Sequence, residues 1–274
     1  ADLIVLQGKE ITYPLIGHTF IAPLIRFSRN TSRYAIWLRG ITGSGKSFIA
    51  RLIQCFYGDF ISDSSIVSWT STANFIQMVG FFFKDSVYVV DDYKRGNVKE
   101  KNDVIKILQS YADNTGRGRL TADSQTKQTK PIRGLIVSTG EDVPEYEASN
   151  IARTIIINCP NKNKNLKEGE RCLKYGKYYS GIMARFIHWF IKNNIRSELN
   201  ELVQENIDFF YKGIEGKQND IRIARNLALN LTGFQLFCDF LYEESFITES
   251  EGIHMLDDAE KILEKTHCQP PENY

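Results

Sequence analysis

Residues 40–47 constrain the fold of this chain more than any other segment, because they read Gly-Ile-Thr-Gly-Ser-Gly-Lys-Ser. We call this run the phosphate loop, since it matches the pattern G-x-x-x-x-G-K-[ST] at every fixed position. Glycines allow the backbone to wrap around an anionic phosphate, so that several N–H groups point inward together with the N-terminus of the following helix. The alternative is a chance glycine-rich turn, which the flanking residues can test.

The flanking residues supply the strand and the helix that such a loop needs. Residues 34–39 are a short apolar run that stops at Gly40, as a buried parallel strand does. Apolar residues then recur at helical spacing until Gly58 ends the pattern. Lys46 would reach the β- and γ-phosphates of a nucleotide, and the hydroxyl of Ser47 would ligate magnesium. The other residues predicted to line the nucleotide site are Gly40, Thr42, Gly43, Ser44, Gly45 and Phe48.

The rest of the first 160 residues alternates between apolar strands and amphipathic helices. Strands are predicted over 86–90, 135–137 and 154–157. Helices are predicted over 72–83, capped by Thr70 or Ser71, and over 98–111. This alternation is typical of an α/β fold, here a parallel sheet of the P-loop NTPase kind with flanking helices.

Beyond Pro160 the chain carries no strand signal. Residues 161–177 are rich in Asn and Lys and are predicted to be exposed. Helical patterns follow over 182–191, 199–210, 221–241 and 259–263. We therefore predict three parts, a helical lead-in over 1–33, a P-loop ATPase core over 34–160 with a basic insertion near 117–133, and a helical lid domain over 161–274.

Composition is that of an ordinary soluble protein, with 274 residues, of which 42% are hydrophobic and 24% charged. The five cysteines are widely spaced and form no Cys-x-x-Cys pair, which favours reduced thiols in a cytosolic protein over disulfides or a zinc site. No apolar run is long enough to span a bilayer, and the first residues lack the pattern of a secretory signal. We therefore expect a cytoplasmic protein with no membrane partner.

Residues 87–92 read Val-Tyr-Val-Val-Asp-Asp and place two carboxylates at the end of an apolar strand. Asp91 would hold the magnesium ion, and Asp92 would orient or deprotonate the attacking water. Many nucleotide hydrolases carry Glu at the second position, and Asp is shorter by one methylene group. The alternative is that Asp92 only caps the strand end.

Further groups are expected near the phosphates. Ser138 and Thr139 end the strand that begins at Leu135, so their hydroxyls would hydrogen-bond the attacking water, unless they form a simple strand-end turn. Arg153 directly precedes the last strand. It would be either a local salt-bridge partner or a finger that reaches the γ-phosphate held by a neighbouring subunit.

The net charge is only +1, but charge is sorted along the chain. Residues 117–133 contain five basic residues and one acidic residue, whereas residues 239–264 contain nine acidic residues and one basic residue. In the basic segment, residues 119–122 and 128–133 would form two arms around a polar turn near 123–126. Lys127, Lys130 and Arg119 would then contact a nucleic-acid phosphate backbone, with a solvated loop as the alternative.

The order of these parts resembles the AAA+ ATPases, and the insertion before the fourth strand resembles the pre-sensor hairpin clade. That clade includes superfamily-three and minichromosome-maintenance-like helicases. The run Leu-Ile-Val-Ser-Thr-Gly-Glu at 135–141, followed by Ala-Arg-Thr at 152–154, is similar to the helicase portion of primase–helicase proteins from phages and mobile elements. The resemblance covers residues 34–160 well and the lid loosely, and the Asp-Asp acid pair departs from the common Asp-Glu.

The resemblance implies a magnesium-dependent ATPase that assembles into a ring, expected to be a hexamer, and moves single-stranded DNA through its centre. It also implies a second sensor on the lid, for which Arg222 and Arg225 are the candidates, with ordinary solvent-facing arginines as the alternative. The expected setting is the cytoplasm of a bacterial host. Two other functions stay open, a monomeric P-loop kinase and a nucleotide-dependent DNA-binding switch or initiator that does not unwind DNA.

Overall fold

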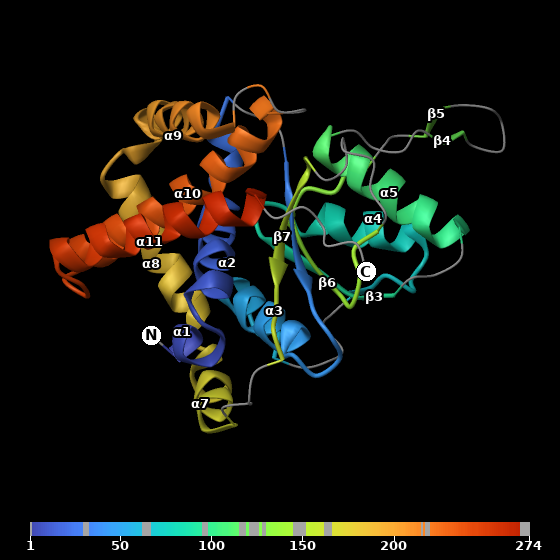
Figure 1. Ribbon diagram of the computed structural model, residues 1–274, viewed down its shortest axis with the longest axis horizontal. Coiled ribbons are helices and arrows are strands. Elements are labelled where there is room, and N and C mark those ends of the chain that lie inside the picture. The colour runs from blue at the N-terminus through green and yellow to red at the C-terminus, as the bar shows by residue number, and fades with distance from the viewer. Residues whose placement is uncertain are drawn as a thin grey trace.

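The computed structural model describes residues 2–29, 33–61, 67–94, 98–114, 119–120, 126–127, 130–144, 152–161, 166–214, 216 and 220–268. Its centre is a five-stranded sheet in the order β2-β3-β6-β1-β7, and all of its strands are parallel (Figure 1). The strands are β1 (Ala35–Arg39), β2 (Val67–Ser68), β3 (Val87–Tyr93), β6 (Leu135–Gly140) and β7 (Thr154–Asn158). All four strands predicted from the sequence are present, and the α/β fold is confirmed.

The register of the sheet brings the ends of three strands to one edge. Arg39, the last residue of β1, lies opposite Gly140, the last residue of β6. Val90 of β3 lies opposite Ser138 of β6, and the pairing shifts between Val90 and Tyr93. Strand β3 therefore continues through the acid pair to the buried Tyr93, rather than ending before it. The short strand β2 was missed, because two residues carry no readable period.

Helices cover both faces of the sheet. In Figure 1, α4 (Ala73–Phe82) and α5 (Val98–Ala112) lie on one side, and α2 (Lys9–Ile21) and α3 (Lys46–Gln54) lie on the other. The helical prediction over 72–83 is confirmed, but its cap is Thr72, whose Oγ1 accepts a hydrogen bond from the Phe75 N–H at 3.3 Å. Thr70 and Ser71 are wrong as caps, because the chain enters helical geometry only at Ala73.

Helix α2 is buried on nearly all sides, from Ile11 to Ile21. It packs closely along α10 (Asp220–Glu243), where Gly17 and Gly233 face each other. A Cβ atom on Gly17 would clash with the Asn230 backbone carbonyl, and one on Gly233 would clash with the Gly17 carbonyl. The N-terminal segment is therefore packed against the C-terminal helices, although the boundaries at 33 and 160 stay predictions.

The remaining α-helices lie on the same side of the sheet as α2 and α3 in Figure 1; α1 precedes the sheet in sequence and the others follow it. Helix α7 falls in the segment predicted only to be exposed, and its Cys172 is fully buried against the core. These elements are α1 (Asp2–Gln7), α7 (Leu166–Gly176), α8 (Tyr179–Lys192), α9 (Leu199–Ile214) and α11 (Glu249–Cys268), with short 3-10 helices at Ile25–Phe27, Cys55–Tyr57 and Ile195–Ser197.

The basic segment contains an antiparallel pair, β4 (Arg119–Leu120) and β5 (Thr126–Lys127), where a hairpin was predicted, but the second arm does not lie over 128–133. Its second arm begins at Thr126, earlier than expected, and in Figure 1 the pair lies beyond α5. Residues 121–125, which include most of the turn predicted near 123–126, and the side chains of Arg119 and Lys127 lie outside the described part of the chain. Lys130 is exposed, and its Nζ lies 5.6 Å from the centre of the Phe81 ring.

Asp239 of α10 is expected to make stability depend on pH. Burial, and then the neighbouring Glu243, raise the pKa of Asp239 to about 6 from its ordinary 3.8. The folded protein therefore binds more protons than the unfolded chain between pH 4 and 6. Protonated Asp239 thus favours the folded state, and this contribution to stability is lost as pH rises through 6. Asp239→Asn should stabilise the protein by about 1 kcal/mol at pH 8, after discounting for partial exposure.

Urea unfolding at pH 4, 5, 6 and 8 checks this expectation. The stability difference between variant and wild type should grow with pH and level off above pH 7. Asp257→Asn on the exposed side of α11 is the matched control and should show no such rise. Equal stability of Asp239→Asn and wild type at pH 8 would contradict the assignment.

Candidate nucleotide-binding site

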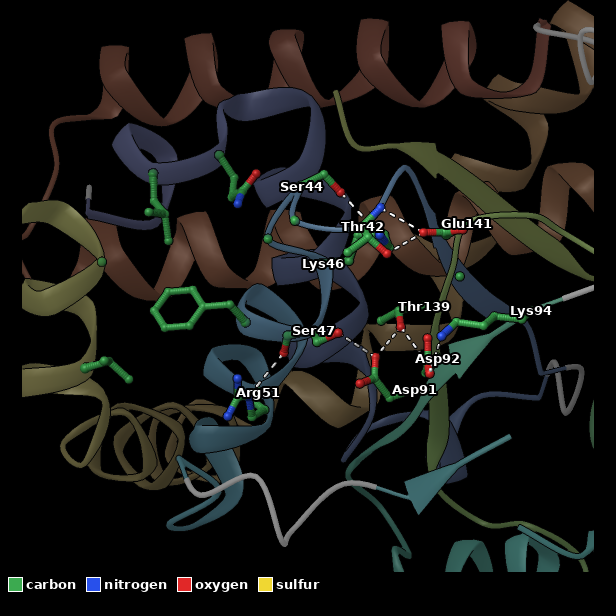
Figure 2. Close-up of a pocket in the computed structure, with 18 of the residues that line it drawn as sticks. Thr42, Ser44, Lys46, Ser47, Arg51, Asp91, Asp92, Lys94, Thr139 and Glu141 are labelled. Atoms are coloured by element: carbon green, nitrogen blue, oxygen red, sulfur yellow. Dashed lines mark hydrogen bonds and ion pairs between the residues drawn. The ribbon is translucent and has the colours of Figure 1, made fainter. Parts of the chain in front are cut away.

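A cavity of about 740 Å³ lies where β1, β3 and β6 end, between the phosphate loop and the helices α1 and α7 (Figure 2). It therefore lies at the carboxyl edge of the parallel strands, where ligands bind in open α/β sheets. Its lining residues are Leu6, Gln7, Thr42, Gly43, Ser44, Gly45, Lys46, Ser47, Phe48, Arg51, Asp91, Asp92, Lys94, Thr139, Gly140, Glu141, Gly169, Glu170 and Leu173.

The phosphate loop has the backbone geometry that its glycines allow. Gly43 and Gly45 both have φ of 86°, a left-handed conformation that strains other residues, and α3 begins directly at Lys46. The Lys46 side chain folds back into the loop, where its Nζ donates to the carbonyls of Gly40 at 2.7 Å and Ile41 at 2.9 Å. The loop thus holds a nearly buried ammonium group at the start of a helix.

Three predicted residues meet around one carboxylate oxygen. The Ser47 hydroxyl donates to Oδ1 of Asp91 at 2.8 Å, and the Thr139 hydroxyl donates to the same oxygen (Figure 2). These residues come from α3, β3 and β6, so only the folded sheet brings them together. A carboxylate beside a hydroxyl is an oxygen donor set of the kind that Mg²⁺ prefers, and Ser47 and Asp91 therefore fit the ion that the sequence predicts.

Asp92 lines the cavity but has an unusual setting. Its φ is 61°, in the left-handed region, at the point where the β3–β6 register shifts. The Asp92 N–H donates to the Thr139 hydroxyl oxygen at 3.1 Å, which fixes the backbone of this irregularity. Its carboxylate is 54% exposed and lies 3.2 Å from Nζ of Lys94.

Ser138 does not reach the cavity. Successive side chains on a strand point to opposite faces, so Thr139 and Ser138 cannot both face the phosphate loop. Ser138 is fully buried, and its hydroxyl accepts a hydrogen bond from Trp69 Nε1 at 2.7 Å. The predicted contact between Ser138 and an attacking water is therefore wrong, and Thr139 is the member of the pair at the site.

Arg153 lies at the other end of the sheet from the phosphate loop. It precedes the first residue of β7, which pairs with the first residue of β1, whereas the loop follows the last residue of β1. At about 3.3 Å per residue, the five residues of β1 separate these ends by roughly 16 Å. The Arg153 guanidinium is 11% exposed and lies 3.2 Å from the Asp113 carboxylate, so it does not line the cavity of its own chain.

The two lid arginines also lie away from the cavity. Asn226, on the same turn of α10 as Arg225, donates to the Ala152 carbonyl at 2.7 Å, beside the start of β7. Arg222 and Arg225 therefore belong to the end of the sheet opposite the phosphate loop. Neither arginine lines the cavity of its own chain, and their role as a second sensor against the γ-phosphate stays a prediction.

Sequence reasoning missed several residues of the site, of which Glu141 is the most closely engaged. Its Oε1 accepts from the Thr42 N–H at 3.0 Å and also from the Thr42 hydroxyl. These hydrogen bonds, the hydroxyl first, lower the pKa of Glu141 below its ordinary value. Its position at the end of β6 was the available signal, because the ends of parallel strands share one edge.

The α1 and α7 side of the cavity was also missed, because nothing in residues 1–7 or 166–176 resembles a binding motif. Leu6 and Leu173, together with Phe48 of α3, which was predicted to line the site, make this side apolar. Gln7 lies over the loop, with its Nε2 2.6 Å from where a Cβ atom on Gly45 would stand. The opposite side is polar, and Figure 2 shows Asp91, Asp92, Thr139 and Glu141 gathered there.

The structure also bears on the cysteines, on other metal sites and on membrane-spanning helices. Cys55, Cys159, Cys172 and Cys238 are buried and unbridged. Among the described residues, no group of three or more His, Cys, Asp or Glu side chains is arranged to hold a metal ion without ligands of another kind. None of the described helices combines the length and hydropathy that a bilayer crossing requires.

No family model and no curated protein matches this chain. Among solved structures, the SCCmec type IV Cch protein, described as an active helicase, superposes with a TM-score of 0.65 at 16% sequence identity. The match covers 94% of this chain and 50% of that chain, so this chain spans about half the length of Cch. A JCV helicase with a bound acetamide compound matches at a TM-score of 0.33 and 10% identity, over 92% of this chain and 61% of that one.

The Cch superposition and the sheet topology define the class of fold. It is a helicase-like P-loop NTPase fold, with a parallel sheet, flanking helices and a helical domain after it.

Proposed function

We propose that this chain is the motor domain of an ATP-dependent DNA helicase or translocase. The observation that carries this proposal is the convergence of Lys46, Ser47, Asp91 and Thr139 on one cavity. A buried ammonium at the start of a helix suits a phosphate chain, and hydroxyl and carboxylate oxygens suit Mg²⁺. The helicase-like fold supports the choice of a motor over a kinase.

In this proposal the apolar side of the cavity takes the nucleoside and the polar side takes the phosphates. Lys46 leaves the carbonyls of its own loop to contact the β- and γ-phosphates, and Thr139 orients the attacking water. Ser47 and Asp91 hold the magnesium ion, which neutralises negative charge that develops during phosphoryl transfer.

The proposal includes a ring, expected to be a hexamer. Arg153 is the residue that tests it, because this arginine lies roughly 16 Å from the loop of its own chain, so any γ-phosphate that it contacts would be held by another copy. An arginine supplied in trans stabilises charge on the transferred phosphoryl group. Under this proposal the protein acts in the cytoplasm of a bacterial host, in the replication of a phage or mobile element.

The β4–β5 hairpin is proposed as the contact with single-stranded DNA, through Lys127, Lys130 and Arg119. Two observations support this role. The segment carries five basic residues in a chain with a net charge of +1. The hairpin lies outside the core, beyond α5 in Figure 1. In that position it is available to a polymer that passes the domain.

ATP hydrolysis measured with and without single-stranded DNA tests the proposal, together with the particle mass in a slowly hydrolysed ATP analogue. We expect magnesium-dependent hydrolysis, stimulation by DNA and assembly into a ring. Phosphate transfer to a small acceptor would favour a kinase, and nucleotide binding without turnover would favour a switch; either result would reject the motor.

The hairpin lysines give a sharper test. Lys127→Ala together with Lys130→Ala should weaken binding of all DNA sequences alike, because phosphate contacts do not read bases. For single-stranded DNA, the slope of log affinity against log salt should flatten by about 0.7 for each phosphate that the variant no longer neutralises. Basal ATP hydrolysis should persist, while DNA stimulation and unwinding are abolished.

The matched control removes two exposed lysines elsewhere, with Lys192→Ala and Lys212→Ala on α8 and α9. This control keeps the same net charge as the hairpin variant, so it separates a local contact from a general charge effect. If the hairpin variant binds and unwinds DNA as well as the control, the hairpin is only a solvated loop.

A further inference from the structure

Three carboxylates stand at the polar side of the cavity, at the ends of β3 and β6: Asp91, Asp92 and Glu141. Hydrolysis of ATP uses one carboxylate for the metal and a second group that orients the attacking water or accepts its proton, a task that a carboxylate can perform. Asp91 is committed to the metal side, because Ser47 and Thr139 both donate to its Oδ1. The second task falls to Asp92 or to Glu141.

Asp92 is poorly placed for the second task. Its carboxylate is drawn to the Lys94 ammonium at 3.2 Å and is 54% exposed. Its backbone is left-handed, and its N–H donates to the Thr139 hydroxyl oxygen, so its Cα is held at the register shift of β3. A base must approach within about 3 Å of the water oxygen, and for Asp92 this would require a side chain one methylene shorter than glutamate to leave Lys94 and extend from that fixed backbone.

Glu141 is better placed than Asp92 to accept the proton. It is one methylene longer, and its Oε1 is anchored by the Thr42 N–H and hydroxyl, within the loop that would hold the phosphates. Both hydrogen bonds end on Oε1, and Oε2 accepts none from the described residues. The carboxylate is therefore oriented by one oxygen and has the other available for a water molecule.

The two sides of the cavity determine which phosphate lies next to Glu141. Leu6, Phe48 and Leu173 form the apolar side, where a nucleoside base is best buried. The phosphate chain then runs along the loop, past Lys46, toward the metal pair Ser47 and Asp91. A nucleotide bound in this way would have its terminal phosphate at the β3–β6 end, which is the end that Glu141 borders.

We propose that Glu141, rather than Asp92, is the catalytic base of this site, a step that rests on the ATP hydrolysis proposed above. One proton of the attacking water passes to Oε2 of Glu141 as the water oxygen bonds to the γ-phosphorus. The bond from that phosphorus to the β–γ bridging oxygen breaks, and its electron pair stays on ADP. Glu141 then releases the proton to solvent, which leaves ADP and inorganic phosphate.

The test compares Glu141→Gln with Asp92→Asn, wild type and Glu205→Gln, an identical change at an exposed glutamate on α9. Glutamine keeps the oxygen that accepts from Thr42 but cannot take a proton. Mg-ATP binding is measured by displacement of a fluorescent nucleotide, and hydrolysis by single-turnover release of phosphate. We expect Glu141→Gln to bind Mg-ATP within about threefold of wild type and to hydrolyse it roughly 100- to 10,000-fold more slowly.

Asp92→Asn should lose less than about tenfold in hydrolysis, since it forfeits only an ion pair with Lys94. Three results overturn the proposal: Glu141→Gln turning over within tenfold of wild type, Asp92→Asn falling as far as Glu141→Gln, or Glu141→Gln losing nucleotide binding, which would make Glu141 a support for the loop. A wild-type protein that binds or hydrolyses no ATP refutes the proposed function instead, and the two failures are therefore distinguishable.

Discussion

Lys46→Ala is expected to abolish ATP hydrolysis and to weaken nucleotide binding strongly. The ammonium of Lys46 is the cation within the phosphate loop, and it lies within 2.9 Å of the loop carbonyls of Gly40 and Ile41. Hydrogen bonds to charged groups contribute about 1.5–3 kcal/mol each, so removing this ammonium should cost about 3 kcal/mol of binding, or roughly 100-fold in Kd. Hydrolysis should fall below detection, because charge developing on the γ-phosphate would lose this cation.

Titration with a fluorescent ATP analogue and a phosphate-release assay measure the two effects. Lys46→Met serves as the companion variant, because it preserves the buried stem and removes only the charge. Both variants should behave alike if charge is the cause. Turnover near the wild-type rate in either variant would show that residues 40–47 do not bind the phosphates of the hydrolysed nucleotide.

Arg153→Ala is expected to slow hydrolysis by about a thousandfold or more while leaving nucleotide binding intact. Within one chain Arg153 cannot reach the cavity, since it stands at the opposite end of the sheet from the loop. A loss of hydrolysis would therefore mean that Arg153 acts on a nucleotide held by a neighbouring copy. Its ion pair with Asp113 would then orient the Arg153 side chain in a copy that has not yet assembled with its neighbour.

Mixing Arg153→Ala protein with Lys46→Ala protein is the deciding measurement. If Arg153 acts across an interface, a Lys46→Ala subunit can donate its arginine to an intact loop on an Arg153→Ala subunit, and some hydrolysis should return. Asp113→Ala is the control for a purely local salt bridge. If Asp113→Ala lowers hydrolysis as much as Arg153→Ala does, and mixing the two proteins restores no hydrolysis, then Arg153 does not act on the nucleotide of a neighbouring subunit.

Much of the fold could be predicted because its signals are local. The phosphate loop needs glycines at set positions to reach positive φ, and Gly43 and Gly45 both adopt it. The central strands are buried on both faces, so they are continuous apolar runs that can be recognised without a partner. The basic hairpin could be predicted for the converse reason, since its polar turn region has no apolar residue for a core.

Residues 1–33 show where local patterns fail. A surface helix has one apolar stripe, whereas α2 is enclosed by the sheet and α10, and its residues from Ile11 to Ile21 are almost all buried. A helix buried on every side has no amphipathic period, so its sequence could not reveal its place. Helix α7 was missed for a different reason, because its Asn- and Lys-rich flank masks a short buried face around Cys172.

The sequence by itself determined which chemical groups this protein has for a phosphate site: a loop lysine, a following serine, a strand-end aspartate and a threonine. Only the tertiary structure decided which groups share that site. Strand alternation turned Ser138 toward Trp69 and Thr139 toward Asp91. The parallel register carried Arg153 and the start of α10 to the far end of the sheet, and brought Glu141 onto Thr42. Such distances depend on how strands far apart in the chain align, and no local pattern encodes that alignment.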